Sequence, residues 1–147
     1  MSESKPTIRV LFLCTGNSCR SQMAEGWARV MHGERVEAHS AGVDPHTLDP
    51  RAVLVMKESG VDISGQHSKS LGDVDHISFD LAVTVCDKAR ESCPVFPSAS
   101  RTVHAGFDDP PYLARNAASE QEALVFYRRV RDEIRDYVAN ELPTLLE

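Results

Sequence analysis

A cysteine that ends an apolar run and is soon followed by Arg-Ser is the feature of this sequence best suited to chemistry. The apolar run at residues 8–13 stops at Cys14, a short polar loop follows, and helical spacing begins at Ser21. Backbone N–H groups in such a loop and at a helix N-terminus point into one concavity and cradle an anion. Arg20 adds a guanidinium fork that matches a tetrahedral oxyanion, and we expect its charge to lower the pKa of Cys14. The segment therefore predicts attack by a thiolate on a phosphate-like substrate.

The loop between this cysteine and the helix is expected to hold the oxyanion. Its binding residues are Thr15, Gly16, Asn17, Ser18, Cys19, Arg20 and Ser21. The pattern Cys-x5-Arg-Ser between a strand and a helix resembles the phosphate loop of tyrosine phosphatases. A buried structural cysteine beside a surface arginine is the alternative interpretation, and the strand–loop–helix context argues against it. For Cys19 we expect a packing role, with a second thiol partner for Cys14 as the alternative.

Length and composition restrict the class of protein. The 147 residues suit one catalytic domain at 8–147, preceded by a flexible leader at 1–7. A net charge of −6 argues against nucleic acid as a partner, so attraction for an anionic substrate must be local. Apolar runs are too short to span a membrane, and the polar N-terminus lacks the core of a signal peptide. We therefore expect a cytoplasmic protein, and a monomer because no strong exposed apolar surface is evident.

Strand-like and helix-like segments alternate along the chain. Strands are predicted at 8–13, 36–41, 80–85 and 101–104, and helices at 21–32, from 50 to about 60, and from 119 to about 140, before Pro143. The first helix should carry Met23, Trp27, Val30 and Met31 roughly on one face. Alternation of this kind predicts a single α/β domain with a four-stranded parallel sheet and helices on both faces. Loops at the carboxyl ends of the strands should then meet at one rim.

A second pair of cysteines follows the third predicted strand. Cys86 and Cys93 are seven residues apart, which on a continuous helix separates them by about 10.5 Å along the axis. A disulfide needs Cα atoms roughly 4.4–6.8 Å apart, so oxidation would have to unwind a helical segment. In a reducing compartment such cysteines are reactive or metal-binding rather than a structural framework. Two buried free cysteines are one alternative, and zinc bound with Cys14 and Cys19 is another, for which the spacings are awkward.

Several segments together now carry a family resemblance. They are residues 14–26, 40–42, 83–86 with Cys93-Pro94, and 106–110. With them the sequence resembles the thioredoxin-coupled arsenate reductases, which share the fold of low-molecular-weight tyrosine phosphatases. The resemblance implies that Cys14 attacks arsenic while Arg20 and the loop amides hold the oxyanion. It also implies that Asp108 is the general acid, with the adjacent Asp109 as the alternative.

The resemblance further implies a thiol relay. Cys86 attacks Cys14 and expels arsenite, Cys93 then attacks Cys86, and thioredoxin reduces the final disulfide. No bound organic cofactor is needed, phosphate should compete with arsenate, and a glutaredoxin and glutathione route stays open. Ser21 should hydrogen-bond the Cys14 thiolate and Asn17 should brace the loop, although each could be a simple cap or turn residue.

The chain departs from the family pattern in three places. Some relatives bind potassium near the positions of Asn17, Glu25 and Ser40 and of an acidic side chain, and here Lys69 stands near the place of the acid. Its ammonium group could replace the ion, which argues against potassium dependence; a solvated Lys69 is the alternative. Ala105 replaces an expected aromatic residue, and the stretch 112–120 is either a flexible flap or a tolerated insertion.

Two other functions compete with arsenate reduction. A low-molecular-weight protein-tyrosine phosphatase would use Cys14, Arg20 and Asp108, with Tyr112 beside a phosphotyrosine ring, and would leave Cys86 and Cys93 without a role. A non-enzymatic oxyanion or redox sensor would signal through residues 86–93. Such a binder should not depend on a proton donor, so replacing Asp108 by Asn separates it from an enzyme.

Overall fold

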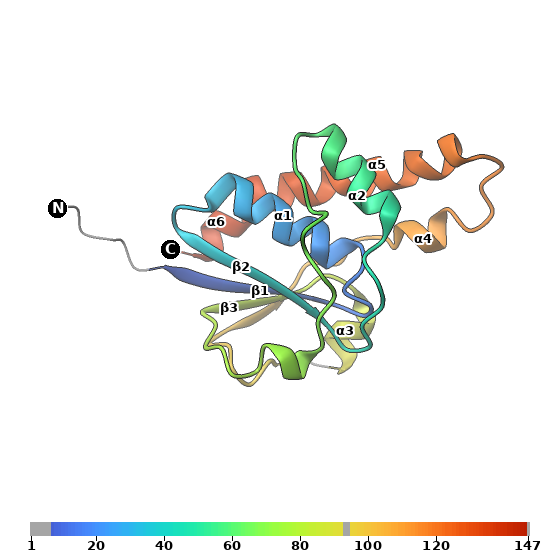
Figure 1. The fold of residues 1–147 in the computed structure, drawn as a ribbon. Helices are drawn as coiled ribbons and strands as arrows, with labels where there is room; N and C mark the ends of the chain where they lie inside the picture. Colours follow the sequence, from blue (N-terminus) through green and yellow to red (C-terminus); the bar gives the residue numbers. More distant parts are fainter. Residues whose placement is uncertain (1–6, 93–94, 147) are drawn as a thin grey trace.

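Four parallel strands form a twisted sheet at the centre of the molecule (Figure 1). In this computed structural model, which describes residues 7–92 and 95–146, the strand order is β2-β1-β3-β4. The strands are β1 (Ile8–Cys14), β2 (Val36–Gly42), β3 (Leu81–Thr84) and β4 (Thr102–His104). Residues 10–13 of β1 are fully buried, because the strand is central and covered on both faces. The predicted four-stranded parallel sheet is confirmed.

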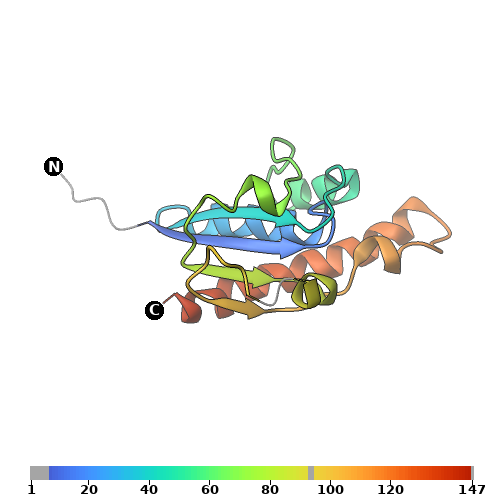
Figure 2. The same ribbon diagram turned by 90° about the horizontal axis from the view of Figure 1, so that it is seen from below.

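Helices cover both faces of the sheet, as predicted, but unequally. The helices α1 (Arg20–His32), α2 (Pro50–Glu58) and α5 (Glu120–Asp136) form a layer on one side, with α1 packed on β1 and β2 and α5 packed on α1 and α2. The short α3 (Asp87–Ser92) and the 3-10 turn η1 (Leu71–Asp73) lie on the other side (Figures 1 and 2). The four-residue α4 (Pro110–Leu113) precedes α5.

Two helix starts follow from local chemistry. Asp49 caps α2 by accepting a hydrogen bond from the Arg51 N–H at 2.9 Å, and Pro50 occupies the first turn, where its missing N–H costs nothing. Ser119 caps α5 by accepting from the Glu122 N–H at 3.1 Å. Both starts were predicted from the sequence.

Two details of the predicted helices differ in the structure. Val30 is 58% exposed, because the last turn of α1 extends beyond the layer that buries residues 21–28. Pro143 does not end the C-terminal helix: a π-helical turn, η2 (Tyr137–Glu141), leads into α6 (Leu142–Leu145), and Pro143 lies in the first turn of α6. The change of hydrogen-bond register at the π turn accommodates a proline, which has no N–H to donate, within the helical run.

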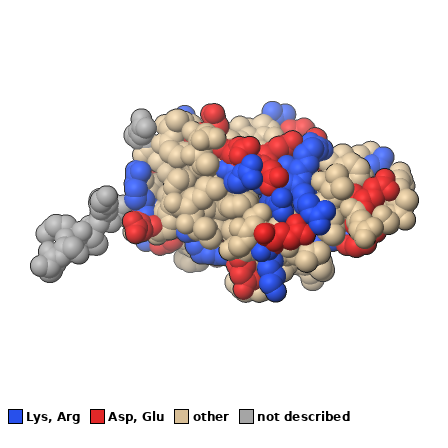
Figure 3. Space-filling model, turned by 90° about the horizontal axis from the view of Figure 1, so that it is seen from above, with Lys and Arg blue, Asp and Glu red and all other residues tan. Residues whose placement is uncertain are grey.

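Charges of both signs are mixed on the helical face (Figure 3). Arg51 pairs with Glu120, and Arg128 pairs with Glu58, each at 2.8 Å. This face therefore provides no single-sign field to attract anions. Within the described residues, no helix is long and apolar enough to cross a bilayer. The predicted boundary between a leader and a domain at residue 8 stays a prediction, since residues 1–6 lie outside the described part.

Candidate active site

The loop between β1 and α1, here called the oxyanion loop (residues 14–20), is held in place by the segment that follows β2 (residues 43–49). Backbone N–H groups from the segment after β2 donate to its carbonyl oxygens: Val43 to Cys14, Asp44 to Thr15, His46 to Gly16 and Asp49 to Ser18, at 2.8–3.2 Å. In a trans peptide the N–H points opposite to the preceding carbonyl. Binding these carbonyls on the outside therefore directs the following N–H groups inward, where an anion would lie.

Asn17 braces the oxyanion loop from behind, as the sequence predicted. Its backbone is left-handed, with φ of 49°, and its side chain is fully buried. Its Nδ2 donates to Ser21 Oγ at 2.8 Å, and its Oδ1 accepts from the Lys69 N–H at 2.8 Å and from Gln22 Nε2 at 3.1 Å. Gly42 allows this approach, because a Cβ there would lie 2.6 Å from the Thr15 carbonyl oxygen. The predicted bond from Ser21 to the Cys14 thiolate stays a prediction.

Two adjoining cavities open in front of the loop. The inner cavity, of about 260 Å³, is lined by Cys14, Gly16, Ser18, Cys19, His46 and Pro111. The outer cavity, of about 580 Å³, is lined by Cys86, Asp87, Lys88, Gly106, Phe107 and Asp108. Thr15, Arg20 and Asp109 line both. The rim predicted from the strand ends therefore exists, and it joins the predicted nucleophile to Cys86 and to both aspartates.

The two aspartates differ in their surroundings. Arg20 is 12% exposed, donates to the Phe107 carbonyl oxygen at 2.8 Å, and places Nη2 3.7 Å from Asp109 Oδ1. Asp108 is 64% exposed and pairs instead with Arg129, at 3.2 Å. The geometry thus favours Asp109, the alternative left open by the sequence, as the carboxyl group beside the oxyanion.

The thiols of Cys14 and Cys86 are hydrogen-bonded to each other across the ends of β1 and β3. This bond, together with Thr15 Oγ1 at 3.3 Å from Cys86 Sγ, lowers the pKa of Cys86 to about 5. The same bond and burial raise the pKa of Cys14 well above its ordinary value. The expectation that Cys14 has a lowered pKa is therefore corrected: the Arg20 charge does lower it, but the partner thiol and burial outweigh that charge. Near neutral pH the pair shares one proton and one negative charge.

The segment after Cys86 is helical in the reduced protein. Here α3 (Asp87–Ser92) begins directly after the cysteine, and the backbone N–H of Ala89 helps to lower the Cys86 pKa. Cys93, the third predicted member of the relay, lies outside the described residues. His104 contacts a residue on each side of Cys86. Its Nδ1 lies 2.8 Å from Thr84 Oγ1, and its Nε2 lies 3.2 Å from Asp87 Oδ1.

Cys19 is buried at the start of α1, and burial raises the pKa of its thiol. Those surroundings suit the predicted packing role. Among the described residues, no three His, Cys, Asp or Glu side chains converge as a metal site.

Sequence reasoning missed the residues that support the loop. Gln22 is fully buried and donates to the Asn17 and His67 carbonyl oxygens, at 2.9 and 3.0 Å. His46 lines the inner cavity, although its segment carries no chemical motif. The available signal for Gln22 was its place within the motif at residues 14–26 that carries the family resemblance.

Comparison with known proteins relates this chain to phosphatases and arsenate reductases. The family described as low molecular weight phosphotyrosine protein phosphatase matches residues 9–146. An arsenate reductase of Bacillus subtilis (strain 168) is 49% identical over 125 residues, covering 85% of this chain and 88% of that protein. A solved arsenate reductase in the phosphate binding state has a TM-score of 0.78 at 28% identity, covering 94% of this chain and 98% of the other. A thioredoxin-dependent arsenate reductase of Corynebacterium glutamicum shares the fold, with a TM-score of 0.66 at 24% identity, over 97% of this chain and 65% of that one.

The chain therefore belongs to the low molecular weight phosphotyrosine protein phosphatase family. Within that family its relatives at almost half identity are arsenate reductases, which confirms the resemblance noted in the sequence.

Proposed function

We propose that this protein reduces arsenate to arsenite through a relay of Cys14, Cys86 and Cys93, and so serves arsenic detoxification. The observation that carries the proposal is the Cys86 thiol, hydrogen-bonded to Cys14 inside the oxyanion site. Reduction needs two electrons, which a pair of thiols supplies. Hydrolysis of a phosphocysteine by water has no use for a second thiol at that place.

The first step joins arsenic to Cys14. The oxyanion loop and Arg20 hold arsenate in the inner cavity. At rest the proton of the thiol pair lies on Cys14, because the Cys86 thiol has the lower pKa. This proton passes along the hydrogen bond to Cys86 as Cys14 attacks, so that Cys14 reacts as a thiolate. Its sulfur bonds to arsenic, and one oxygen leaves as water after it takes a proton from the general acid. We assign that acid to Asp109, because Asp109 lines both cavities beside Arg20 while Asp108 is paired with Arg129.

The second step is the reduction. The Cys86 sulfur attacks the Cys14 sulfur, an S–S bond forms, and the S–As bond breaks with its electron pair left on arsenic. Arsenic passes from the +5 to the +3 state, the two cysteines are oxidised, and the Cys86 proton leaves on arsenite.

The third step restores Cys14. Cys93 attacks Cys86 and releases Cys14 as a thiolate, for which α3 must unwind, since a continuous helix would keep the two residues about 10.5 Å apart. The dithiol of thioredoxin then reduces the Cys86–Cys93 disulfide. No bound cofactor takes part.

The proposal extends to a competing ligand, a cellular compartment and an oligomeric state. Phosphate has the charge and nearly the shape of arsenate, so it competes for the oxyanion loop. Reduced cysteines of this kind suit the cytoplasm. The large exposed apolar side chains on the helices come from different elements, among them Val30 on α1 and Val125 on α5, which supports a monomer.

The test is arsenate-dependent NADPH oxidation with thioredoxin and thioredoxin reductase. Wild type should turn over, and both Cys86→Ser and Cys93→Ser should fall to background because each interrupts the relay. Ser92→Ala, an exposed change at the end of α3, is the matched control and should keep turnover.

The alternatives give different results in the same experiment. Turnover only with glutaredoxin and glutathione would change the electron donor but keep the relay. If wild type does not reduce arsenate, but cleaves an aryl phosphate at a rate that Cys86→Ser leaves unchanged, the protein is a phosphatase.

A further inference from the structure

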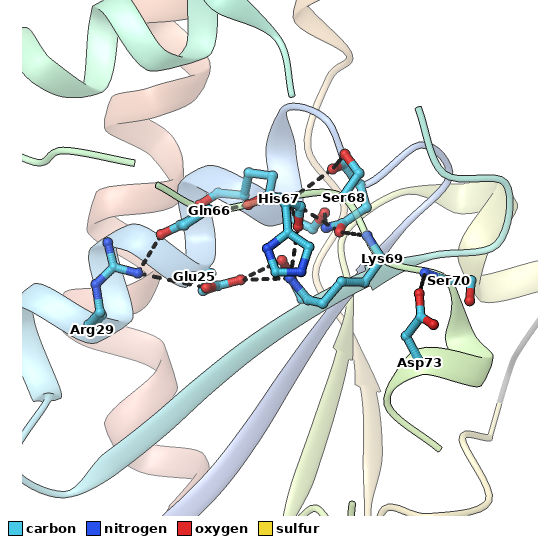
Figure 4. Close-up of polar contacts among 12 residues, drawn as sticks. Glu25, Arg29, Gln66, His67, Ser68, Lys69, Ser70 and Asp73 are labelled. Atoms are coloured by element: carbon cyan, nitrogen blue, oxygen red, sulfur yellow. Dashed lines mark hydrogen bonds and ion pairs between the residues drawn. The ribbon is translucent and has the colours of Figure 1, made fainter. Parts of the chain in front are cut away.

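The ammonium group of Lys69 lies among oxygen atoms next to the oxyanion loop (Figure 4). Its side chain is only 16% exposed, and its Nζ donates to the His67 carbonyl oxygen at 2.9 Å. The same Nζ lies 3.9 Å from Oε1 of Glu25, a carboxylate on α1 that is itself 12% exposed. The alternative of a solvated lysine therefore does not describe this residue.

The two oxygens of the Glu25 carboxylate face different cations. Oε1 faces Lys69 and accepts a hydrogen bond from Ser40 Oγ at 2.5 Å. Oε2 faces Arg29, whose Nη1 lies 3.7 Å away, so Glu25 lies between two positive groups in Figure 4. A carboxylate this buried needs a compensating cation, and the chain supplies it from its own side chains.

The segment that carries the ammonium group also holds the oxyanion loop. The Lys69 N–H donates to Asn17 Oδ1 at 2.8 Å, and Ser68 Oγ donates to the Asn17 carbonyl oxygen at 2.6 Å. Gln22 Nε2 joins the carbonyl oxygens of Asn17 and His67. Anchoring Lys69 on Glu25 thus fixes the groups that keep Asn17 in its left-handed conformation.

We propose that Lys69 is a built-in cation, which makes the stability and the oxyanion affinity of this protein independent of alkali metal ions. The residues do not fit the potassium ion that the family resemblance implied, because the ammonium group already occupies the oxygen-lined place beside Glu25. Lys69 is a positioning residue, since it acts on the oxyanion through Asn17. The inference depends on the proposed oxyanion site but not on arsenate turnover.

Exchanging the ammonium group for a carboxylate should create the missing ion site. In Lys69→Asp, the new carboxylate, Glu25 Oε1 and the His67 carbonyl oxygen would supply hard oxygen ligands of the kind that alkali cations bind. Lys57→Asp is the matched control, because it makes the same charge change at an exposed position of α2.

The experiment compares KCl with choline chloride at an equal ionic strength of about 0.1 M, which screens surface charges equally in both salts. Thermal unfolding gives Tm, and calorimetric titration with inorganic phosphate gives Kd. Wild type and Lys57→Asp should show the same Tm and Kd in both salts. Lys69→Asp should show a Tm higher by about 2–4 °C in KCl, and tighter phosphate binding in KCl than in choline chloride.

Two results would overturn the inference. A wild-type Tm or phosphate Kd that improves in KCl over choline chloride would mean that potassium still binds beside Lys69. No response of Lys69→Asp to potassium would mean that the place is not a cation site. If Lys69→Asp fails to fold, the wild-type Tm and phosphate Kd in KCl and in choline chloride still test whether the protein responds to potassium. Both readouts are independent of arsenate reduction, so failure here is distinguishable from failure of the proposed function.

Discussion

The three described cysteines of this site have different roles because their surroundings differ. Cys14, Cys19 and Cys86 are all buried thiols, yet only Cys14 and Cys86 share a hydrogen bond and a proton. For Cys19, burial is the main cause of the raised pKa of its thiol. The charge available for nucleophilic attack therefore belongs to the Cys14–Cys86 pair, and Arg20 keeps it next to the oxyanion loop.

Substitutions of Asp108 and Asp109 test which of the two neighbouring aspartates is the general acid. Asp109→Asn should lower the single-turnover rate of arsenate reduction by about 10²–10⁴-fold, because the departing oxygen loses its proton donor. Asp108→Asn should have a much smaller effect, since it breaks only an exposed pair with Arg129 that is worth about 0–1 kcal/mol of stability. Rapid-quench measurement of enzyme-bound product checks both. The reverse order of the two losses would return the general acid to Asp108, as the sequence had first suggested.

At the scale of elements, the short helix α3 is the part that must move. It has six residues and begins directly after Cys86, and His104 on β4 anchors its first residue, Asp87, while also contacting Thr84 on β3. Breaking a half-exposed pair of this kind removes about 0.2–1 kcal/mol of local stability. His104 thus sets how easily α3 opens for the third step of the relay.

His104→Ala should therefore speed amide hydrogen exchange in residues 87–92 by up to about five-fold, with α1 unchanged. Exchange followed by mass spectrometry on the reduced protein measures this. His76→Ala, at an exposed position before β3, is the control and should leave α3 as in wild type. Equal exchange in both variants would show that His104 does not anchor α3.

At the scale of the whole molecule, the sequence predicted what depends on periodicity and missed what depends on long-range contacts. The four strands, their parallel arrangement, the helix start at Pro50 and the cap at Ser119 follow from local patterns. The hydrogen bonds from residues 43–49 to the oxyanion loop join segments about thirty residues apart and carry no local signal. The raised pKa of Cys14 was missed for the same reason, because its first cause is the thiol of Cys86, which follows another strand.

An anion bound in the oxyanion loop should stabilise the whole fold. The loop connects β1, α1, the segment after β2 and the segment before η1, and it does so only when all of them are folded. Phosphate at about 100 times its Kd should contribute about 2.7 kcal/mol and raise Tm by about 5–10 °C. Arg20→Lys should lose most of this gain, because an ammonium group cannot replace the guanidinium fork on a tetrahedral oxyanion. Arg35→Lys, an exposed change before β2, should keep the gain in full. Scanning calorimetry of the three proteins with and without phosphate measures the shifts, and an undiminished gain in Arg20→Lys would place the bound anion outside the oxyanion loop.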